Sequence, residues 1–230
     1  LNPSSAASDV YKRQGGADVL WIETLSSIEE CQAAVQGASV AGLPIILTLS
    51  IETNGRTMMG ITPSDLVNLQ SDLPTPLAAY GTNCGLGAAE VVAAIINMRQ
   101  AANLAGDDPI LVAKGNCGIP EWVDGKICYS GTPELMASYA KMVIDAGARI
   151  VGGCCGTSPE HIAVMREAID NHVAGSAPSH DDITSTLGVI TSGAKAQMSG
   201  DLSIAGGAAG PGKKASGRSR RRLKPSNSIF

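Results

Sequence analysis

Residues 149–160, RIVGGCCGTSPE, contain an apolar run that ends in two glycines and two cysteines. Residues 149–153 have the composition of a short buried strand. Ser158 followed by Pro159 is typical of a helix start, because a hydroxyl group caps free backbone N–H groups and proline fits the first helical position. The sequence therefore predicts a strand, a cysteine-bearing loop and a helix in direct succession.

Four similar apolar runs precede this one, and stretches with helical spacing lie between the runs. The predicted strands are 18–23 (DVLWIE), 44–49 (PIILTL), 76–82 (PLAAYGT), 109–113 (PILVA) and 149–153 (RIVGG). Thr62-Pro63 and Thr132-Pro133 mark two further helix starts. Alternating strands and helices predict an α/β fold with a parallel sheet. The strands are apolar without strict alternation, so an open doubly wound sheet and part of a (β/α)8 barrel both fit.

Three cysteines directly follow predicted strands. Cys84 follows strand 76–82 in GTNCG, and Cys154 and Cys155 follow strand 149–153. Because the carboxyl ends of parallel strands open on one face, we expect these thiols to converge. Three thiolates with an open fourth position are typical of a catalytic zinc site, and sulfur ligands favour zinc over magnesium or calcium. A substrate thiol bound at the fourth position would lose its proton and become a nucleophile.

The remaining cysteines are predicted to have no metal. Cys31 falls on the apolar face of a helical stretch, whereas Cys117 and Cys128 lie in loop sequence near the predicted active face. Six cysteines in 230 residues are too few for a disulfide scaffold, and no signal peptide opens the sequence. These features favour a reducing compartment, and we expect a cytoplasmic protein.

Composition excludes several classes of protein. The chain is 44% apolar and 17% charged, which is enough to build a core. Its longest apolar stretch, near residues 43–51, is well short of the roughly 20 residues of a membrane span, so we expect a soluble protein with no membrane partner. Aromatic residues make up 3% of the chain, which argues against stacking on single-stranded nucleic acid.

The two ends differ from the body. Residues 1–14, LNPSSAASDVYKRQ, lack periodicity and resemble an adapter-derived translation, so we exclude them from the fold and expect one domain over residues 15–175. Residues 176–230 are rich in Gly, Ala and Ser and are predicted to be disordered. Residues 1–201 carry 10 basic and 21 acidic residues, whereas residues 202–230 carry seven basic residues and no acid.

Five motifs together resemble the homocysteine S-methyltransferase family, which includes betaine–homocysteine methyltransferase and the homocysteine domain of cobalamin-dependent methionine synthase. The motifs are WIET, GRTMMG, GTNCG, KGNCGIP with VDGKICY downstream, and IVGGCCGTSPEHI, within about residues 15–170. The resemblance implies a (β/α)8 barrel of which this chain holds the last five βα units, strands 4 to 8. It also implies that the chain is truncated at its N-terminus and is inactive alone, because a barrel short of three strands has two open edges.

The resemblance also implies a reaction and a site. Cys84, Cys154 and Cys155 match the family's zinc ligands, and zinc would activate homocysteine as a thiolate that attacks a donor methyl group to form methionine. Glu23 matches the acidic residue that holds the amino group of homocysteine, while Asn83 and Gly153 would shape the pocket. No catalytic residue beyond the ligands is expected. The methyl donor (betaine, S-methylmethionine, or methyl-cobalamin with folate) and the oligomeric state stay open.

A second hypothesis concerns the basic C-terminal end. The seven cations of residues 202–230 would be able to neutralise phosphates, so a non-catalytic chain that binds nucleic acid or an anionic surface is the alternative to an enzyme. A short basic terminus on an acidic body is more often a solvated tail. Nucleic acid is therefore a less favoured partner than homocysteine and its methyl donor.

Overall fold

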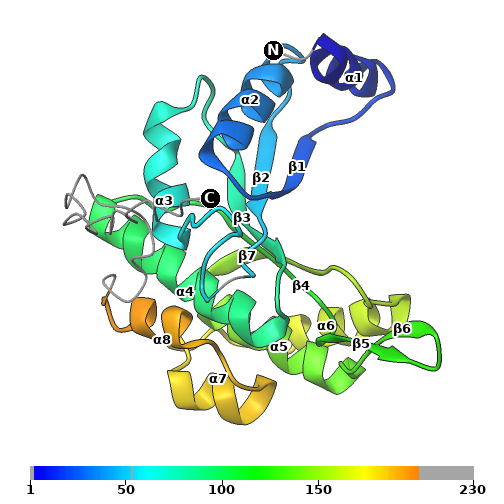
Figure 1. The fold of residues 1–230 in the computed structure, drawn as a ribbon, viewed down its shortest axis with the longest axis vertical. Coiled ribbons are helices and arrows are strands. Elements are labelled where there is room, and N and C mark those ends of the chain that lie inside the picture. Colours follow the sequence, from blue (N-terminus) through cyan, green and yellow to red (C-terminus); the bar gives the residue numbers. More distant parts are fainter. Residues whose placement is uncertain (1–2, 53, 202–230) are drawn as a thin grey trace, which may run out of the picture.

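The computed structural model describes residues 3–52 and 54–201, and its centre is a parallel sheet of five strands (Figure 1). The strands are β1 (Leu20–Leu25), β2 (Ile45–Leu49), β3 (Ala79–Cys84), β4 (Leu111–Gly115) and β7 (Ala148–Gly153). Each of the five predicted strands overlaps one of these. They lie side by side in chain order, so the strand order never reverses as it does in a doubly wound sheet. Strands β1 and β7 form the two edges.

Five helices connect or follow the strands. They are α2 (Ile28–Ser39), α3 (Pro63–Leu69), α4 (Ala88–Ala105), α5 (Pro133–Asp145) and α6 (Pro159–Asp170), and a 3-10 turn, Gln70–Asp72, follows α3. The predicted starts at Thr62, Thr132 and Ser158 are confirmed as N-caps followed by proline. In α3, the Thr62 hydroxyl accepts a hydrogen bond from the Asp65 N–H at 3.1 Å.

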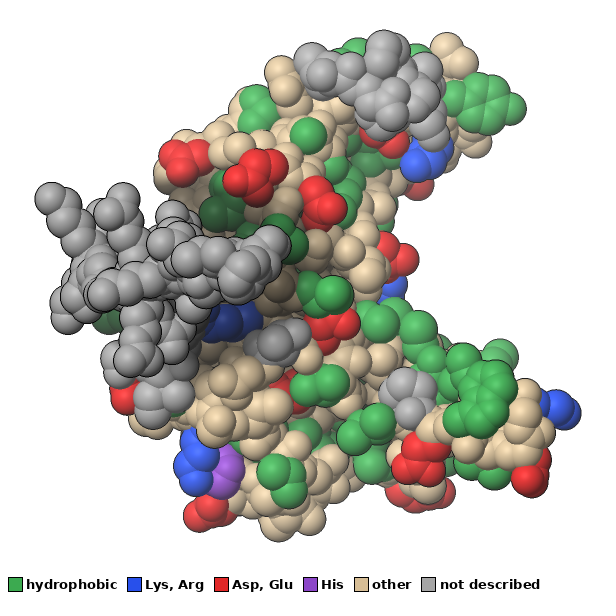
Figure 2. Space-filling model, viewed as in Figure 1, with side chains coloured by type: hydrophobic (Ala, Val, Ile, Leu, Met, Phe, Trp, Pro, Cys, Tyr) green, Lys and Arg blue, Asp and Glu red, His purple; other side chains and the backbone are tan. Residues whose placement is uncertain are grey.

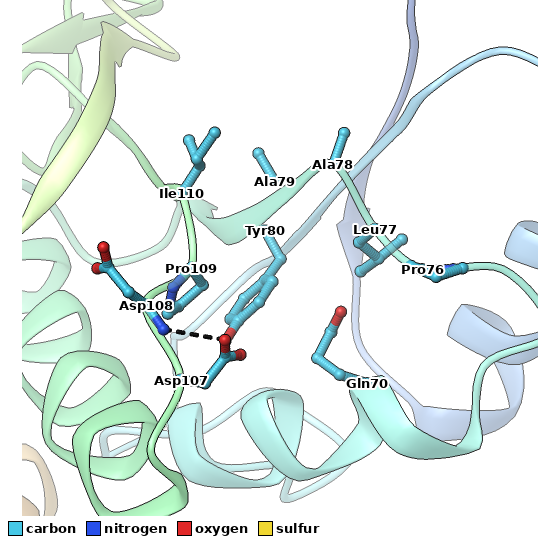
Figure 3. A pocket seen from close by; sticks show the side chains of 10 residues that line it. All are labelled: Gln70, Pro76, Leu77, Ala78, Ala79, Tyr80, Asp107, Asp108, Pro109 and Ile110. Carbon is cyan, nitrogen blue, oxygen red and sulfur yellow. Dashed lines mark hydrogen bonds between the residues drawn. The ribbon is translucent and has the colours of Figure 1, made fainter.

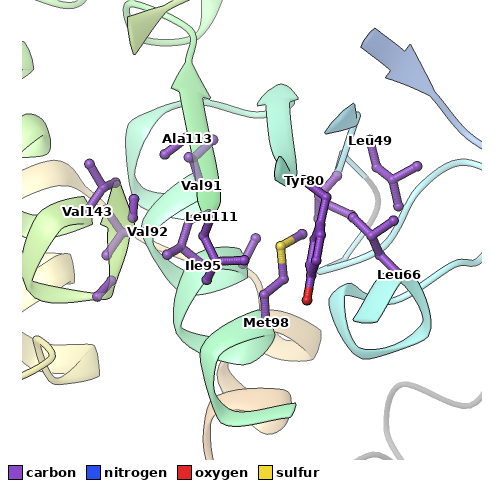
Figure 4. Close-up of a cluster of buried hydrophobic side chains, with 14 of the residues drawn as sticks. Leu49, Leu66, Tyr80, Val91, Val92, Ile95, Met98, Leu111, Ala113 and Val143 are labelled. Atoms are coloured by element: carbon purple, nitrogen blue, oxygen red, sulfur yellow. The ribbon is translucent and has the colours of Figure 1, made fainter. Parts of the chain in front are cut away.

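The main core lies between the helices and one face of the sheet. Figure 4 shows Val92 and Ile95 of α4 beside Leu111 and Ala113 of β4, all of which belong to one buried cluster. The opposite face carries a much smaller cluster of Ile46, Ala79 and Val112, with Ile150 packed against it. A doubly wound sheet would be covered by helices on both faces.

The face away from the helices is concave. Lys114 of β4 and Glu23 of β1 form an ion pair at 2.5 Å, although β2 and β3 lie between these strands. In a flat sheet, β1 and β4 would be about 14 Å apart, and side chains stand roughly perpendicular to the sheet. The sheet therefore curves toward this face. Figure 2 shows the molecule hollowed on the side between α1–α2 and the β5–β6 hairpin.

The hairpin is an element that the sequence analysis did not predict. Strands β5 (Pro120–Val123) and β6 (Lys126–Tyr129) pair antiparallel between β4 and α5. Asp124 and Gly125 at its tip have φ angles of 48° and 77°, the left-handed pair that a tight two-residue turn requires. The Asp-Gly dipeptide was the signal for this turn.

The structure also places a helix where no element was expected. Helix α1 (Pro3–Gln14) packs against α2, and the Arg13 guanidinium donates a hydrogen bond to the Ala41 carbonyl oxygen at 2.6 Å. Residues 3–14 were excluded from the fold because they lack apolar periodicity. The structure instead places them in a helix that contacts the rest of the domain. The contact depends on a charged side chain at the helix end, which a hydrophobic pattern does not show.

The prediction of disorder beyond residue 175 is wrong for residues 180–198. This segment forms α7 (His180–Leu187) and α8 (Ser192–Met198); α7 packs on α4 and α5, and α8 packs on α4. Ile183 and Ala194 are buried, and Ser179 and Thr191 cap the two helices. Small residues here allow close packing instead of preventing a core. Residues 202–230, with the basic cluster of the alternative hypothesis, lie outside the described residues. Among the residues described, no helix is long and apolar enough to cross a membrane.

Candidate metal centre

Three cysteine side chains meet at the carboxyl-terminal edge of the sheet. The Sγ atoms of Cys84 and Cys155 are 3.9 Å apart, those of Cys154 and Cys155 are 4.0 Å apart, and all three lie within 4.8 Å of one another. Tetrahedral zinc with zinc–sulfur distances of about 2.3 Å holds its thiolates about 3.8 Å apart. The donor set and its spacing therefore fit zinc. Cys155 is exposed, which leaves one side of the cluster open to a further ligand.

The backbone at Cys84 is in an uncommon conformation. Cys84 has a φ of 62° and Gly85 a φ of 73°, and a side chain on Gly85 would come within 2.4 Å of the Ile51 carbonyl oxygen. A left-handed conformation costs a residue with a side chain about 1 to 2 kcal/mol. Such strain often marks functional sites, and here it accompanies the turn that carries Cys84 to the other two cysteines.

Asn116 joins the two loops that carry the cysteines, and the sequence analysis did not select it. Its buried side chain donates a hydrogen bond to the Gly85 carbonyl oxygen at 2.9 Å and accepts one from the Cys155 N–H at 3.1 Å. The signal in the sequence was an asparagine directly after the strand that precedes it, in KGNCG, at the same edge as the cysteines.

The Cys84 thiol holds its proton firmly without a metal. Burial raises the pKa of Cys84 to about 11, although a hydrogen bond with Asn116 acts in the opposite direction. A metal ion that binds here must therefore displace a proton from Cys84, and binding is expected to release protons to the solvent.

The other three cysteines stay apart from this cluster, which is the one group of its kind among the described residues. Cys31 is buried in α2, where burial raises the pKa of its thiol to about 12. The buried Cys117 thiol donates a hydrogen bond to the Gly131 carbonyl oxygen at 3.1 Å, and Cys128 is exposed on β6.

Glu23 lies on the concave face near the end of β1, where the structure gives it a partner from its own chain. Besides pairing with Glu23, the Lys114 ammonium group lies 4.8 Å from the centre of the Trp21 ring. Lys114 was not selected from the sequence, although it is the one charged residue at the end of an otherwise apolar strand. The three side chains form a charged and aromatic patch beside the cysteine edge.

Asn83 is fully buried and ties the end of β3 to the end of β1. Its amide oxygen accepts hydrogen bonds from the Thr24 N–H at 2.9 Å and the Thr48 hydroxyl at 2.7 Å, and its amide nitrogen donates to the Thr24 hydroxyl at 2.8 Å. Thr24 has a φ of 66°, so Asn83 stabilises an uncommon conformation next to Glu23. At Gly153, a side chain would come within 2.3 Å of the Thr157 hydroxyl, which requires glycine at the end of β7.

A different hollow, of about 340 Å³, lies at the opposite edge of the sheet (Figure 3). It is lined by residues that precede or begin β3 and β4, among them Leu77, Tyr80, Asp107 and Ile110. Chemistry in parallel α/β folds is carried by the carboxyl ends of the strands. This hollow at the amino ends is therefore not part of the cysteine site.

Comparison with known families identifies the class of protein that has this fold and this cluster of three cysteines. The sequence profile of a family described as homocysteine S-methyltransferase matches residues 6–169, and this chain belongs to that family. It is 30% identical over 172 residues to the methionine synthase of Mycobacterium leprae, covering 71% of this chain and 14% of that protein. It is 28% identical over 177 residues to betaine–homocysteine S-methyltransferase 1 of Danio rerio, covering 70% and 42%.

A solved structure shares the fold. The apo crystal structure of the homocysteine methyltransferase MmuM from Escherichia coli matches with a TM-score of 0.52 at 24% identity, over 71% of this chain and 57% of that one. The chain thus spans less than two thirds of the length of each of these relatives.

Proposed function

We propose that this chain provides the homocysteine-binding, zinc-dependent part of a methyltransferase that methylates the sulfur of homocysteine to form methionine. The observation that carries the proposal is the group of three cysteine sulfur atoms, which lie within 4.8 Å of one another at the carboxyl edge of the sheet, close to the spacing of tetrahedral zinc ligands. Membership of the homocysteine S-methyltransferase family supports the same acceptor. The relatives include a methionine synthase and a betaine-dependent enzyme, so the proposal leaves the donor among betaine, S-methylmethionine and methyl-cobalamin with folate.

We further propose that the five strands correspond to strands 4 to 8 of a (β/α)8 barrel. Three observations support this correspondence: the strands follow chain order, the main core joins the helices to one face of the sheet, and the other face is concave. A barrel wall has all three properties. The edges at β1 and β7 are then the positions at which the remaining strands of a closed barrel would pair.

In the proposed mechanism, Cys84, Cys154 and Cys155 hold zinc, and zinc when bound supplies a Lewis acid that lowers the pKa of a substrate thiol. The open side at Cys155 admits the substrate and lets its proton leave to solvent. Glu23 receives the amino group of homocysteine in exchange for the Lys114 ammonium group. Asn83 holds the backbone beside Glu23, and Gly153 keeps the floor of the site free of a side chain. Holding acceptor and donor in line contributes much of the acceleration.

Free thiolate ligands require reducing surroundings, so we place this activity in a reducing compartment such as the cytoplasm. All six cysteines are unpaired in the structure. Oxidation of Cys84 with Cys155 would remove two of the three ligands at once.

The test combines zinc content with binding of homocysteine. We expect the chain to hold about one zinc ion, measured by elemental analysis, and to bind homocysteine with release of a proton, measured by calorimetry in buffers of different ionisation enthalpy. Cys84→Ser should lose zinc and homocysteine binding together. The matched control is Cys31→Ser, which changes a cysteine outside the cluster and should keep both. Equal zinc content in the two variants would contradict the proposal.

A further inference from the structure

Lys114 is the one charged residue of β4, and its side chain crosses the concave face to β1. A side chain on Gly152 would meet the Lys114 Cγ atom at 3.4 Å, so the lysine stem lies beside the bare backbone of β7. Its ammonium group pairs with Glu23 at 2.5 Å and lies 4.8 Å from the centre of the Trp21 ring. The Lys114 side chain is 22% exposed, so most of it is removed from solvent.

Lys114 lies one residue before the cysteine edge. In the sheet it stands opposite Asn83, the residue before Cys84. The next residue of β4, Gly115, accepts a hydrogen bond on its carbonyl oxygen from the Cys154 N–H at 2.9 Å. Successive residues of a strand are about 3.3 Å apart along it. A short molecule whose sulfur lies among the cysteines therefore has its other end within reach of Lys114 and its carboxylate partner.

The acceptor in the proposed function carries both signs of charge at that other end. Homocysteine has its ammonium and carboxylate groups on the same carbon atom, separated from the sulfur by two methylene groups. When the ammonium group binds Glu23 in exchange for Lys114, the lysine loses its carboxylate partner. A largely buried cation without a partner is unfavourable. The substrate carboxylate arrives together with the ammonium group, and it supplies the partner that Lys114 has lost.

The Trp21 ring gives Lys114 a second contact while it changes partners. The indole N–H of Trp21 donates a hydrogen bond to the Thr48 hydroxyl at 3.4 Å, and Thr48 is fully buried, so the ring is held on the concave face. The face of an indole ring attracts an ammonium ion whether or not a carboxylate lies beside it. The Lys114 ammonium group is therefore able to leave Glu23 and remain over the ring.

We propose that Lys114 is a specificity-determining residue that binds the carboxylate group of the acceptor, so that Glu23 and Lys114 together select a thiol that is also an α-amino acid. In the free protein the two residues pair with each other. In the complex each pairs with the substrate group of opposite charge. This proposal rests on the proposed function and adds to it the chemical class of acceptor that the site admits. An aminothiol without a carboxylate displaces Lys114 and leaves it unpaired.

The test is calorimetry on the zinc-loaded chain with two thiols as probes. L-Homocysteine carries both charged groups, whereas 3-amino-1-propanethiol differs from it in lacking the carboxylate. We expect the parent to bind homocysteine about tenfold more tightly than the aminothiol. Lys114→Met keeps an unbranched stem without the charge. It should bind homocysteine more weakly than the parent and the aminothiol at least as tightly, because Glu23 is then unpaired, so the tenfold preference should disappear.

The control is Lys141→Met, which removes an exposed lysine of α5 and should keep the parental preference. Equal affinity of the parent for the two thiols overturns the role of Lys114 without any variant. A preference that persists in Lys114→Met also overturns it, because the carboxylate is then bound elsewhere. Loss of zinc and of both thiols in Lys114→Met shows a merely structural role. These three outcomes leave the proposed function standing, whereas a parent chain that binds neither thiol overturns the proposed function and the role of Lys114 together.

Discussion

Two regions of this molecule were read from the sequence with opposite results. The first, here called the metal edge, comprises Cys84, Cys154 and Cys155 with their loops, and its convergence was expected from strand ends alone. The second, here called the C-terminal arm, is residues 180–198, which were expected to be disordered but form α7 and α8. The metal edge was predictable from local sequence, because each cysteine lies at or directly after the end of a strand. The parallel sheet then brings these strand ends together at one edge.

The C-terminal arm depends on contacts between residues more than 100 positions apart. The Thr191 N–H donates to the Glu90 carboxylate at 2.5 Å, the Gly193 N–H donates to the Asn54 side chain at 2.7 Å, and Gln197 donates to the Gly55 carbonyl oxygen at 3.0 Å. Gln197 is buried, although glutamine is a polar residue. Composition alone cannot show such pairings, because a Gly- and Ala-rich segment has the same composition whether or not a complementary surface exists.

The largest expected effect tests whether the metal edge needs more than its ligands. Asn116→Ala removes both hydrogen bonds that join the Cys84 and Cys155 loops and should weaken zinc binding by about 100-fold, because residues that orient metal ligands typically contribute 10- to 100-fold. Competition with a chelator measures the affinity. Asn103→Ala, an exposed change on α4, should leave it unchanged. If Asn116→Ala bound zinc as tightly as the parent, the three cysteines would bind the metal without help from Asn116.

The next effect concerns the C-terminal arm. A side chain at Gly193 would come within 2.2 Å of the Asn54 carbonyl oxygen, so Gly193→Ala should lower the free energy of unfolding by about 2 kcal/mol, as overpacking does. Urea denaturation measures the change, and hydrogen exchange should show loss of protection around Asn54 and Gly55. In the control Gly175→Ala the new methyl group meets its neighbour at an ordinary 3.7 Å. Unchanged stability in Gly193→Ala would show that the arm contributes little.

Much of the sheet was predictable because each strand combines an apolar run with a nearby helix start, as at Thr132-Pro133. The partners of the candidate site residues could not be predicted from the sequence. Lys114 reaches Glu23 because the sheet curves, and curvature is a property of all five strands together. Asn83, selected as a residue that shapes the pocket, proved to be fully buried and bonded to Thr24. The hairpin was missed because its Asp-Gly turn lies inside a motif that was used only for its resemblance.

A smaller effect tests the pair on the concave face. Glu23→Gln removes the charge that holds Lys114, and it should weaken homocysteine binding about tenfold while zinc content stays the same, because hydrogen bonds to charged groups contribute about 1.5 to 3 kcal/mol. Calorimetry with homocysteine measures the affinity. Glu167→Gln, an exposed change on α6, is the control. An unaltered affinity would mean that Glu23 only pairs with Lys114 and stabilises the curved sheet. Substrate recognition would then depend on the cysteines without Glu23.

The smallest effect contrasts a core cysteine with an exposed one. Burial raises the pKa of Cys31 to about 12 from the ordinary value of 9.0, so its neutral thiol stabilises the fold fully below pH 9, and this contribution is lost as the pH rises from 9 toward 12. Cys31→Ala should therefore be less stable than the parent at pH 8, with a difference in unfolding free energy that narrows above pH 9. Urea denaturation across this range measures the difference. Cys128 is exposed, so Cys128→Ala should change the unfolding free energy little. A difference for Cys31→Ala that stays constant with pH would mean that the Cys31 thiol ionises in the folded chain as easily as in the unfolded one, contrary to its burial in α2.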